Sequence, residues 1–150
     1  MERITSFSVD HNKLEPGVYI SRIDGDITTY DLRFIKPNTP PFLDINAMHT
    51  IEHLFATYAR NGKLKDNVIY FGPMCCCTGF YLLMRDTSYE DALAYIKEVM
   101  KDCMNHQGKI PGTDKIECGN YLAHDAEKAH NSLVEYYNVI KDLTTEDLYY

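Results

Sequence analysis

Two histidines in the middle of the chain have the spacing of a metal-binding pair. His49 and His53 are four residues apart, so on a helix both rings project from one face, one turn apart, and can hold one metal ion. Glu52 directly precedes His53, about 100° round the helix, where its carboxylate can act as a base beside a metal. A solvated helix face is the alternative that this pair alone leaves open.

A catalytic metal site needs a third protein ligand and one open position. Cys118 is a candidate because the adjacent Gly119 allows a tight turn that lets the thiolate reach inward. A set of two histidines and one cysteine leaves one tetrahedral position for water or substrate. On the sequence alone, a buried thiol without a ligand role explains Cys118 as well.

Three consecutive cysteines, Cys75 to Cys77, occupy a predicted turn between two strands. Adjacent cysteines cannot easily all face one ion, and the C-x-x-C spacing is missing. A catalytic thiol is therefore favoured over a second metal site, and a nearby divalent cation would stabilise its thiolate. With five cysteines in all, an odd number, free thiols are favoured over a disulfide framework.

The elements that must position these residues follow from periodicity and turn signals. Alternating apolar residues predict strands over 17–24, 27–36, 67–72 and 78–84. Apolar stripes with helical spacing predict helices from a cap at Asp44 or Asn46 to about residue 61, from Ser88 to about residue 103, and over 123–143. We expect a surface arm over 1–16 carrying a solvated His11, a short extended piece over 116–121, and a frayed end over 144–150.

Length and charge limit the function classes. The 150 residues fit one domain over 1–150. A net charge of −7, without a cluster of Lys and Arg, opposes a nucleic-acid partner or an anionic membrane surface. No stretch is apolar enough to span a bilayer, and a cytoplasmic location is expected.

Five segments together resemble one enzyme family, S-ribosylhomocysteine lyase, which produces the precursor of autoinducer-2. They occur in the family's order over nearly the whole chain, at 6–11, 30–34, 48–56, 72–81 and 117–124. The resemblance implies an α+β fold, with an antiparallel sheet layered with three main helices and the metal site on a helix at the sheet edge. It also implies a homodimer with active sites at the interface.

The resemblance further assigns roles to residues. It implies that His49, His53 and Cys118 bind one Fe2+, for which Zn2+ or Co2+ can substitute. Glu52 and Cys76 would carry protons, and three residues would hold the substrate: Ser6, His11 and Arg33. The implied reaction cleaves S-ribosylhomocysteine to homocysteine and 4,5-dihydroxy-2,3-pentanedione by successive carbonyl migration and β-elimination.

Three positions depart from the family pattern. Cys75 stands where the family usually has glycine, Cys77 where arginine is common, and Tyr70 where aspartate is frequent. We expect backbone strain at Cys75 and a less stabilised Cys76 thiolate without the neighbouring cation. Two other functions stay open at this point, a small metallopeptidase of the inverted-zincin type and a non-catalytic metal or thiol redox module.

Overall fold

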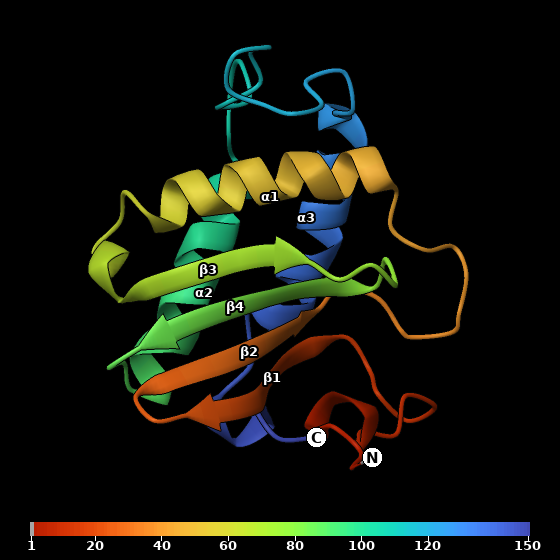
Figure 1. Ribbon diagram of the computed structural model, residues 1–150, viewed down its shortest axis with the longest axis vertical. Helices are drawn as coiled ribbons and strands as arrows, with labels where there is room; N and C mark the ends of the chain where they lie inside the picture. The colour runs from red at the N-terminus through yellow and green to blue at the C-terminus, as the bar shows by residue number, and fades with distance from the viewer. Residues whose placement is uncertain (1) are drawn as a thin grey trace.

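A four-stranded antiparallel sheet forms the centre of the molecule in a computed structural model that describes residues 2–150 (Figure 1). The strands are β1 (Gly17–Asp24), β2 (Ile27–Arg33), β3 (Val68–Pro73) and β4 (Gly79–Arg85), and their order is β1-β2-β4-β3. The described residues also contain three α-helices, α1 (Ile45–Ala59), α2 (Tyr89–Met104) and α3 (Ala126–Ile140). The predicted α+β fold is confirmed.

The two faces of the sheet differ in what they bury. Tyr30, Leu32 and their β4 partners Leu82 and Phe80 are fully or almost fully buried in one core cluster with the helices. In Figure 1, α2 and α3 cross behind the sheet on this side. Because side chains alternate along a strand, Asp31, which lies between Tyr30 and Leu32, points to the opposite, outer face.

Helix α1 lies along β3, an edge strand of the sheet. The Asp44 side chain accepts hydrogen bonds from the backbone N–H groups of Asn46 and Ala47, so Asp44 is the N-cap. Ile51, Leu54 and Phe55 bury one side of the helix. The remaining side carries the two histidines, which confirms the predicted site on a helix at the sheet edge.

Three predicted boundaries, the end of β2 and both ends of α3, and one predicted element were wrong; α3 ends at Ile140 and not at residue 143. Strand β2 ends at Arg33 because the N–H groups of Phe34 and Ile35 both turn to one acceptor, the Thr78 carbonyl. Helix α3 begins at Ala126, where the Asp125 carboxylate caps the Lys128 N–H. Residues 116–121 are not extended: the Cys118 N–H donates to the carbonyl of Asp114, which folds this segment into turns.

The last residues are ordered and not frayed. A short 3-10 helix (Thr145–Asp147) leads to Leu148, which is fully buried. The carbonyl of Leu148 accepts a hydrogen bond from the Ile20 N–H of β1 at 2.8 Å. The end of the chain is thus tied to the β1 edge of the sheet. Among residues 2–150, none of the helices has the length and apolar character needed to cross a membrane.

Candidate metal centre and active site

Four side chains that could bind a metal lie close together beside helix α1. Their ligand atoms, in His49, His53, Cys118 and His124, all lie within 4.8 Å of one another. The Cys118 sulfur is 3.5 Å from His49 Nε2, 3.9 Å from His53 Nε2 and 3.8 Å from His124 Nε2. The structure therefore brings together the three predicted ligands and adds a fourth, His124.

The other ring nitrogen of each histidine is held by a hydrogen bond. His49 Nδ1 lies 2.8 Å from the Ala123 carbonyl, and His53 Nδ1 lies 2.9 Å from the Pro111 carbonyl. A carbonyl oxygen can only accept, so in both rings Nδ1 carries the proton. Each Nε2 then offers a lone pair toward Cys118, as metal-binding histidines do.

Thr50 fixes His124 in the same way. The Thr50 hydroxyl donates its only proton to the Asn46 carbonyl at 3.0 Å, so its oxygen is the acceptor for the Asp125 N–H at 3.0 Å and for His124 Nδ1 at 3.2 Å. His124 Nε2 therefore also carries a free lone pair. Burial, followed by the neighbouring His49 and His53, lowers the pKa of His124 to about 4, so at neutral pH the ring is in the uncharged form that binds metals.

The spacing of the four donor atoms fits a tetrahedral transition-metal site. Nitrogen and sulfur ligands at their usual distances from Zn2+ lie about 3.6 Å apart at the tetrahedral angle, close to the 3.5–3.9 Å separations here. Three nitrogen lone pairs around one thiol cannot all be satisfied by a single S–H proton. A cation shared by the four atoms satisfies them together.

Two loops position the ligands on the side away from α1. The loop after α2 presents the Pro111 carbonyl to His53, and Gly112 follows with a φ of +70°. A Cβ on Gly112 would lie 3.1 Å from His53 Nδ1, so a side chain there would crowd the ring. Glycine is thus required both by the backbone conformation and by the close approach.

Glu52 stands beside the metal ligands with a free carboxylate. Among residues 2–150 it has no hydrogen-bond or ion-pair partner, and its side chain is half-buried. It lines an apolar cavity of about 360 Å³ together with His49, Met74, Cys75 and Cys77. This position suits the predicted role of a proton carrier next to a metal.

Cys76 lies on a different side of the turn, against a buried cation. Its sulfur is 3.1 Å from Thr78 Oγ1 and 4.0 Å from Nη1 of Arg33. Arg33 is 3% exposed, pairs with Asp31 at 2.6 Å and donates to Thr78 at 2.5 Å. Burial opposes the charge, but the pair with Asp31 and the nearby Cys76 raise the pKa of Arg33, which keeps it protonated.

The predicted substrate residues Ser6 and His11 lie away from the metal ligands of the same chain. Both belong to the N-terminal arm, which packs beside β1, whereas α1 packs beside β3 at the other edge of the sheet (Figure 1). His11 Nδ1 bonds to the Val9 carbonyl within the arm. Within one chain, then, Arg33 is near Cys76, but Ser6 and His11 are not part of the metal centre.

The departures at the cysteine turn have less effect than the sequence suggests. Cys75 does not have a positive φ; the left-handed residue is Cys77, with a φ of +58°. The expected strain at Cys75 was therefore wrong. The guanidinium of Arg33 lies 4.0 Å from the Cys76 sulfur, and the expected effect of the missing cation at position 77 stays a prediction. Tyr70 is half exposed, and its ring covers Gly72.

Comparison with known proteins shows which family has a sequence like this one. A model of the S-Ribosylhomocysteinase (LuxS) family matches residues 4–146. The chain belongs to this family. The LuxS match contains every candidate site residue, from Ser6 in the arm to His124 before α3. Residues 1–3 and 147–150 lie outside it.

Individual LuxS relatives align over the full chain. The S-ribosylhomocysteine lyase of Finegoldia magna is 45% identical, with 100% of this chain and 99% of the relative covered. The S-ribosylhomocysteine lyase of Phocaeicola vulgatus is 42% identical, with 100% and 98% covered. That of Borreliella burgdorferi is 38% identical, with 100% and 99% covered.

Sequence reasoning did not assign roles to His124 or Thr50. His124 lies six residues after Cys118 in a turn-rich segment, where spacing alone does not indicate that both side chains face one point. The available signal was the grouping of a cysteine and a histidine just ahead of a capped helix. Thr50 gave no signal beyond its place between the two histidines.

Proposed function

We propose that this chain is a metal-dependent lyase that cleaves S-ribosylhomocysteine. The observation that carries the proposal is the convergence of His49, His53 and Cys118, with their lone pairs fixed toward one point, beside the free carboxylate of Glu52. Membership in the LuxS family and full-length similarity to proteins named S-ribosylhomocysteine lyase support the substrate. Inverted zincins generally take a carboxylate as third ligand, and the cluster found in residues 2–150 has none.

The chemistry requires protons to move along a sugar chain. The thioether sits at carbon 5, and the proton on carbon 4 becomes acidic only when a carbonyl reaches carbon 3. Two transfers of a proton between neighbouring carbons move the carbonyl from carbon 1 to carbon 3. Removal of the carbon 4 proton then expels the homocysteine thiolate by β-elimination.

The residues of this chain divide that work between two proton carriers. Glu52, beside the metal ligands, takes a proton from one carbon and returns it to the next. Cys76, whose sulfur lies 4.0 Å from Nη1 of Arg33, acts from the other side of the substrate. The bound metal supplies a Lewis acid that polarises a substrate oxygen. We propose Fe2+ as the ion, with Zn2+ or Co2+ as substitutes, held by His49, His53 and Cys118, with His124 in the fourth position until a substrate oxygen replaces it.

We further propose that the active site is completed by a second copy of the chain. The arm that carries Ser6 and His11 lies at the opposite sheet edge from the metal ligands, so one copy does not bring these residues to its own Cys76. In a homodimer the arm of one copy supplies them to the site of the other. A cytoplasmic location stays a prediction, supported by five free thiols.

The first test is homocysteine release from S-ribosylhomocysteine, followed as free thiol under anaerobic conditions with Fe2+ or Co2+. A sample without substrate corrects for the thiols of the protein. We expect metal-dependent release that Cys76→Ala abolishes without loss of bound metal, whereas the neighbouring Cys75→Ala retains turnover. A fully active Cys76→Ala variant would refute its role, and a metal-loaded protein without release would refute the lyase.

Mixed dimers test the shared site. Cys76→Ala and His11→Ala are each expected to be inactive as homodimers. After subunit exchange, a mixed dimer contains one site with both substitutions and one site with neither, so activity should return to about half of the wild-type value per mixed dimer. Failure to recover activity, with mixed dimers shown by mass, would place His11 in the same site as Cys76 of its own chain.

A further inference from the structure

The outer face of the sheet carries a buried ion pair under a tyrosine cover. Asp31 and Arg33 are 1% and 3% exposed, although they lie on the face opposite the helices. Charged side chains are rarely so buried unless they are paired. The cover is supplied by Tyr19 and Tyr81, the cross-strand neighbours of Asp31 on β1 and β4, and by Tyr150 from the end of the chain.

A chain of hydrogen bonds runs from Tyr150 to Cys76. The Tyr150 hydroxyl donates to Asp31 Oδ2 at 2.8 Å, and Nη2 of Arg33 donates to the same oxygen at 2.6 Å. Nη1 of Arg33 donates to Thr78 Oγ1. Since Thr78 Oγ1 is the acceptor of that bond, its own proton is available to the Cys76 sulfur, 3.1 Å away.

The geometry of the Asp31–Arg33 ion pair differs from the side-on geometry that an isolated carboxylate and guanidinium would adopt. Asp31 Oδ1 and Arg33 Nε are buried and have no hydrogen-bond partner within residues 2–150. A side-on pair, with Nε and Nη2 donating to both oxygens, would satisfy both atoms. Leaving two buried polar atoms unpaired costs free energy, so contacts outside the pair must hold it in its present geometry.

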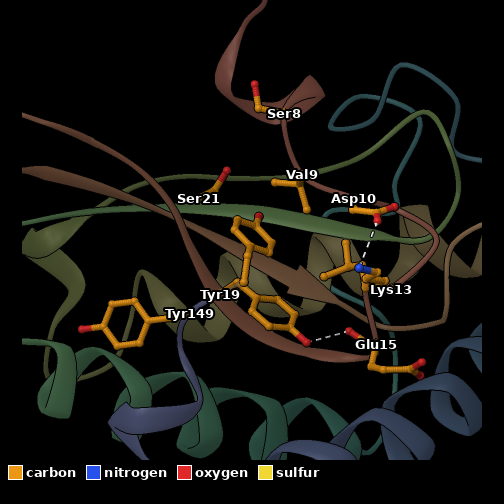
Figure 2. A pocket seen from close by; sticks show the side chains of 10 residues that line it. Ser8, Val9, Asp10, Lys13, Glu15, Tyr19, Ser21 and Tyr149 are labelled. Atoms are coloured by element: carbon orange, nitrogen blue, oxygen red, sulfur yellow. Dashed lines mark hydrogen bonds and ion pairs between the residues drawn. The ribbon is translucent and has the colours of Figure 1, made fainter.

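Tyr150 lies where it can hold the Asp31–Arg33 pair in its present geometry. Its ring stacks on Tyr19, with centroids 4.9 Å apart and planes at 14°, and the nearby Leu148 carbonyl bonds to β1. Figure 2 shows Tyr19 with its hydroxyl bonded to the Glu15 carbonyl at one wall of a cavity of about 510 Å³, which Tyr150 also lines. Burial, and then Asp31, raises the pKa of Tyr150, so it remains a donor at neutral pH.

We propose that Asp31 and Tyr150 are positioning residues for Cys76: the Tyr150 hydroxyl fixes one oxygen of Asp31, and this keeps the guanidinium of Arg33 turned toward Thr78 and the Cys76 sulfur. The inference rests on the proposed role of Cys76 as a proton carrier. Without the Tyr150 hydroxyl, Asp31 turns to a side-on pair with Arg33. Nη1 then moves away from Thr78, and the Cys76 thiolate loses its cation.

Few charged or titratable groups face Cys76 from the sheet. They are Arg33 from β2 and Tyr81 from β4, with Asp31 acting through Arg33. Burial raises the pKa of Tyr81, so neither Tyr81 nor Tyr150 ionises between pH 5 and 9. Over that range Tyr81 and Tyr150 keep one protonation state.

The experiment measures alkylation of Cys76 by iodoacetamide between pH 5 and 9 in metal-loaded protein. Cys75→Ala with Cys77→Asn is the reference background, because asparagine tolerates the left-handed backbone at position 77. In this background Tyr150→Phe keeps the stacked ring and removes only the hydroxyl. Tyr149→Phe is the matched control, because Tyr149 is 63% exposed.

We expect Tyr150→Phe to slow Cys76 alkylation at pH 7 by three- to tenfold, to move the pH profile to higher pH, and to leave the limiting rate at high pH unchanged. Tyr149→Phe should match the background. Identical profiles for Tyr150→Phe and the background would overturn the proposal, and so would a uniform slowing at every pH.

Homocysteine release is measured on the wild-type protein, because Cys75 and Cys77 line the cavity beside Glu52, and it separates this inference from the proposed function. Alkylation involves no ribosyl substrate. A shifted profile in a protein that never releases homocysteine would keep the positioning role and reject the lyase. An active enzyme with an unshifted profile would keep the lyase and reject the positioning role.

Discussion

At the scale of single residues, proton placement decides what the metal centre can bind. Each histidine uses Nδ1 for a hydrogen bond to the protein and turns Nε2 toward Cys118. Two of these bonds go to backbone carbonyls and one goes to the Thr50 hydroxyl. Because hydrogen-bond partners of the ligating rings fix the ring orientation and tautomer, Thr50 should matter for metal affinity although it is not a ligand.

Replacing Thr50 by valine tests this role. The variant keeps the shape of the side chain but removes the acceptor for His124 Nδ1 and for the Asp125 N–H. We expect Zn2+ affinity to fall about 10- to 100-fold, measured by competition with a chromophoric chelator. Thr57→Val is the control, because its hydroxyl also bonds back along α1 but contacts no ligand ring. Equal affinities in the two variants would contradict the role of Thr50.

His124 also predicts how the metal-free protein responds to acid. Its pKa is lowered to about 4 in the folded state, against an ordinary value near 6.5. The unfolded chain therefore binds a proton that the folded chain does not, and stability falls as the pH drops below about 6.5 until both states are protonated below about 4. Urea unfolding at pH 7 and pH 5 should show that the free energy of unfolding falls less on acidification for His124→Gln than for wild type. His130→Gln, on an exposed part of α3, should behave as wild type.

At the scale of elements, the site depends on loops pressed against a rigid helix. Helix α1 holds His49 and His53 with one side buried in the core, while the segments around Pro111 and Ala123 supply the carbonyls that orient the rings. Loops that carry a site need a defined backbone shape, which here relies on glycine at position 112. The two glycines of this loop allow the backbone effect to be separated from the contact effect.

Gly112→Ala and Gly108→Ala form a matched pair. Both residues have positive φ, +70° and +89°, so both variants should lose about 1 to 2 kcal/mol of stability from backbone strain. Only at Gly112 does the new Cβ meet a ligand, at 3.1 Å from His53 Nδ1, whereas nothing lies within 4 Å at Gly108. We therefore expect weaker metal binding in Gly112→Ala alone. Similar metal affinities in both variants would show that the contact is unimportant.

At the scale of the whole molecule, the two edges of the sheet carry different parts of the site. The metal ligands belong to the β3 edge with α1, and the arm and the chain end belong to the β1 edge. The turn that carries Cys76 connects β3 to β4, and its cation comes from β2. The sheet thus places Cys76 within reach of Arg33, whose partner Asp31 is bonded to Tyr150 at the end of the chain.

Ending the chain at Asp147 should weaken the fold as well as the site. Leu148 is fully buried, and losing a fully buried leucine costs about 1.5 to 3 kcal/mol. Urea unfolding should show a loss of this size for the shortened chain. Tyr149→Ala, at an exposed position, should change the free energy of unfolding by no more than about 0.5 kcal/mol, and a shortened chain as stable as wild type would contradict the tied end.

The sequence predicted the strands and the three helices, which depend on local periodicity. It also named three of the four residues that the structure gathers into a group able to hold a metal. It misplaced features that depend on distant contacts. The order of the chain end depends on Leu148 meeting β1, and the burial of Arg33 depends on Asp31 and on Tyr150. His124 joins the centre through Thr50, 74 residues away in sequence, and a local pattern does not reveal such a contact.

The separation of the ligands along the chain gives the metal a structural consequence. Cys118 and His49 are 69 residues apart in sequence, and all five thiols are free, so the chain has no covalent cross-link. An ion that binds both residues closes a loop of that length, as a disulfide would. In the chain-entropy model such a closure is worth about 4 kcal/mol. A cell short of the metal would therefore lose enzyme to unfolding and proteolysis as well as losing catalysis.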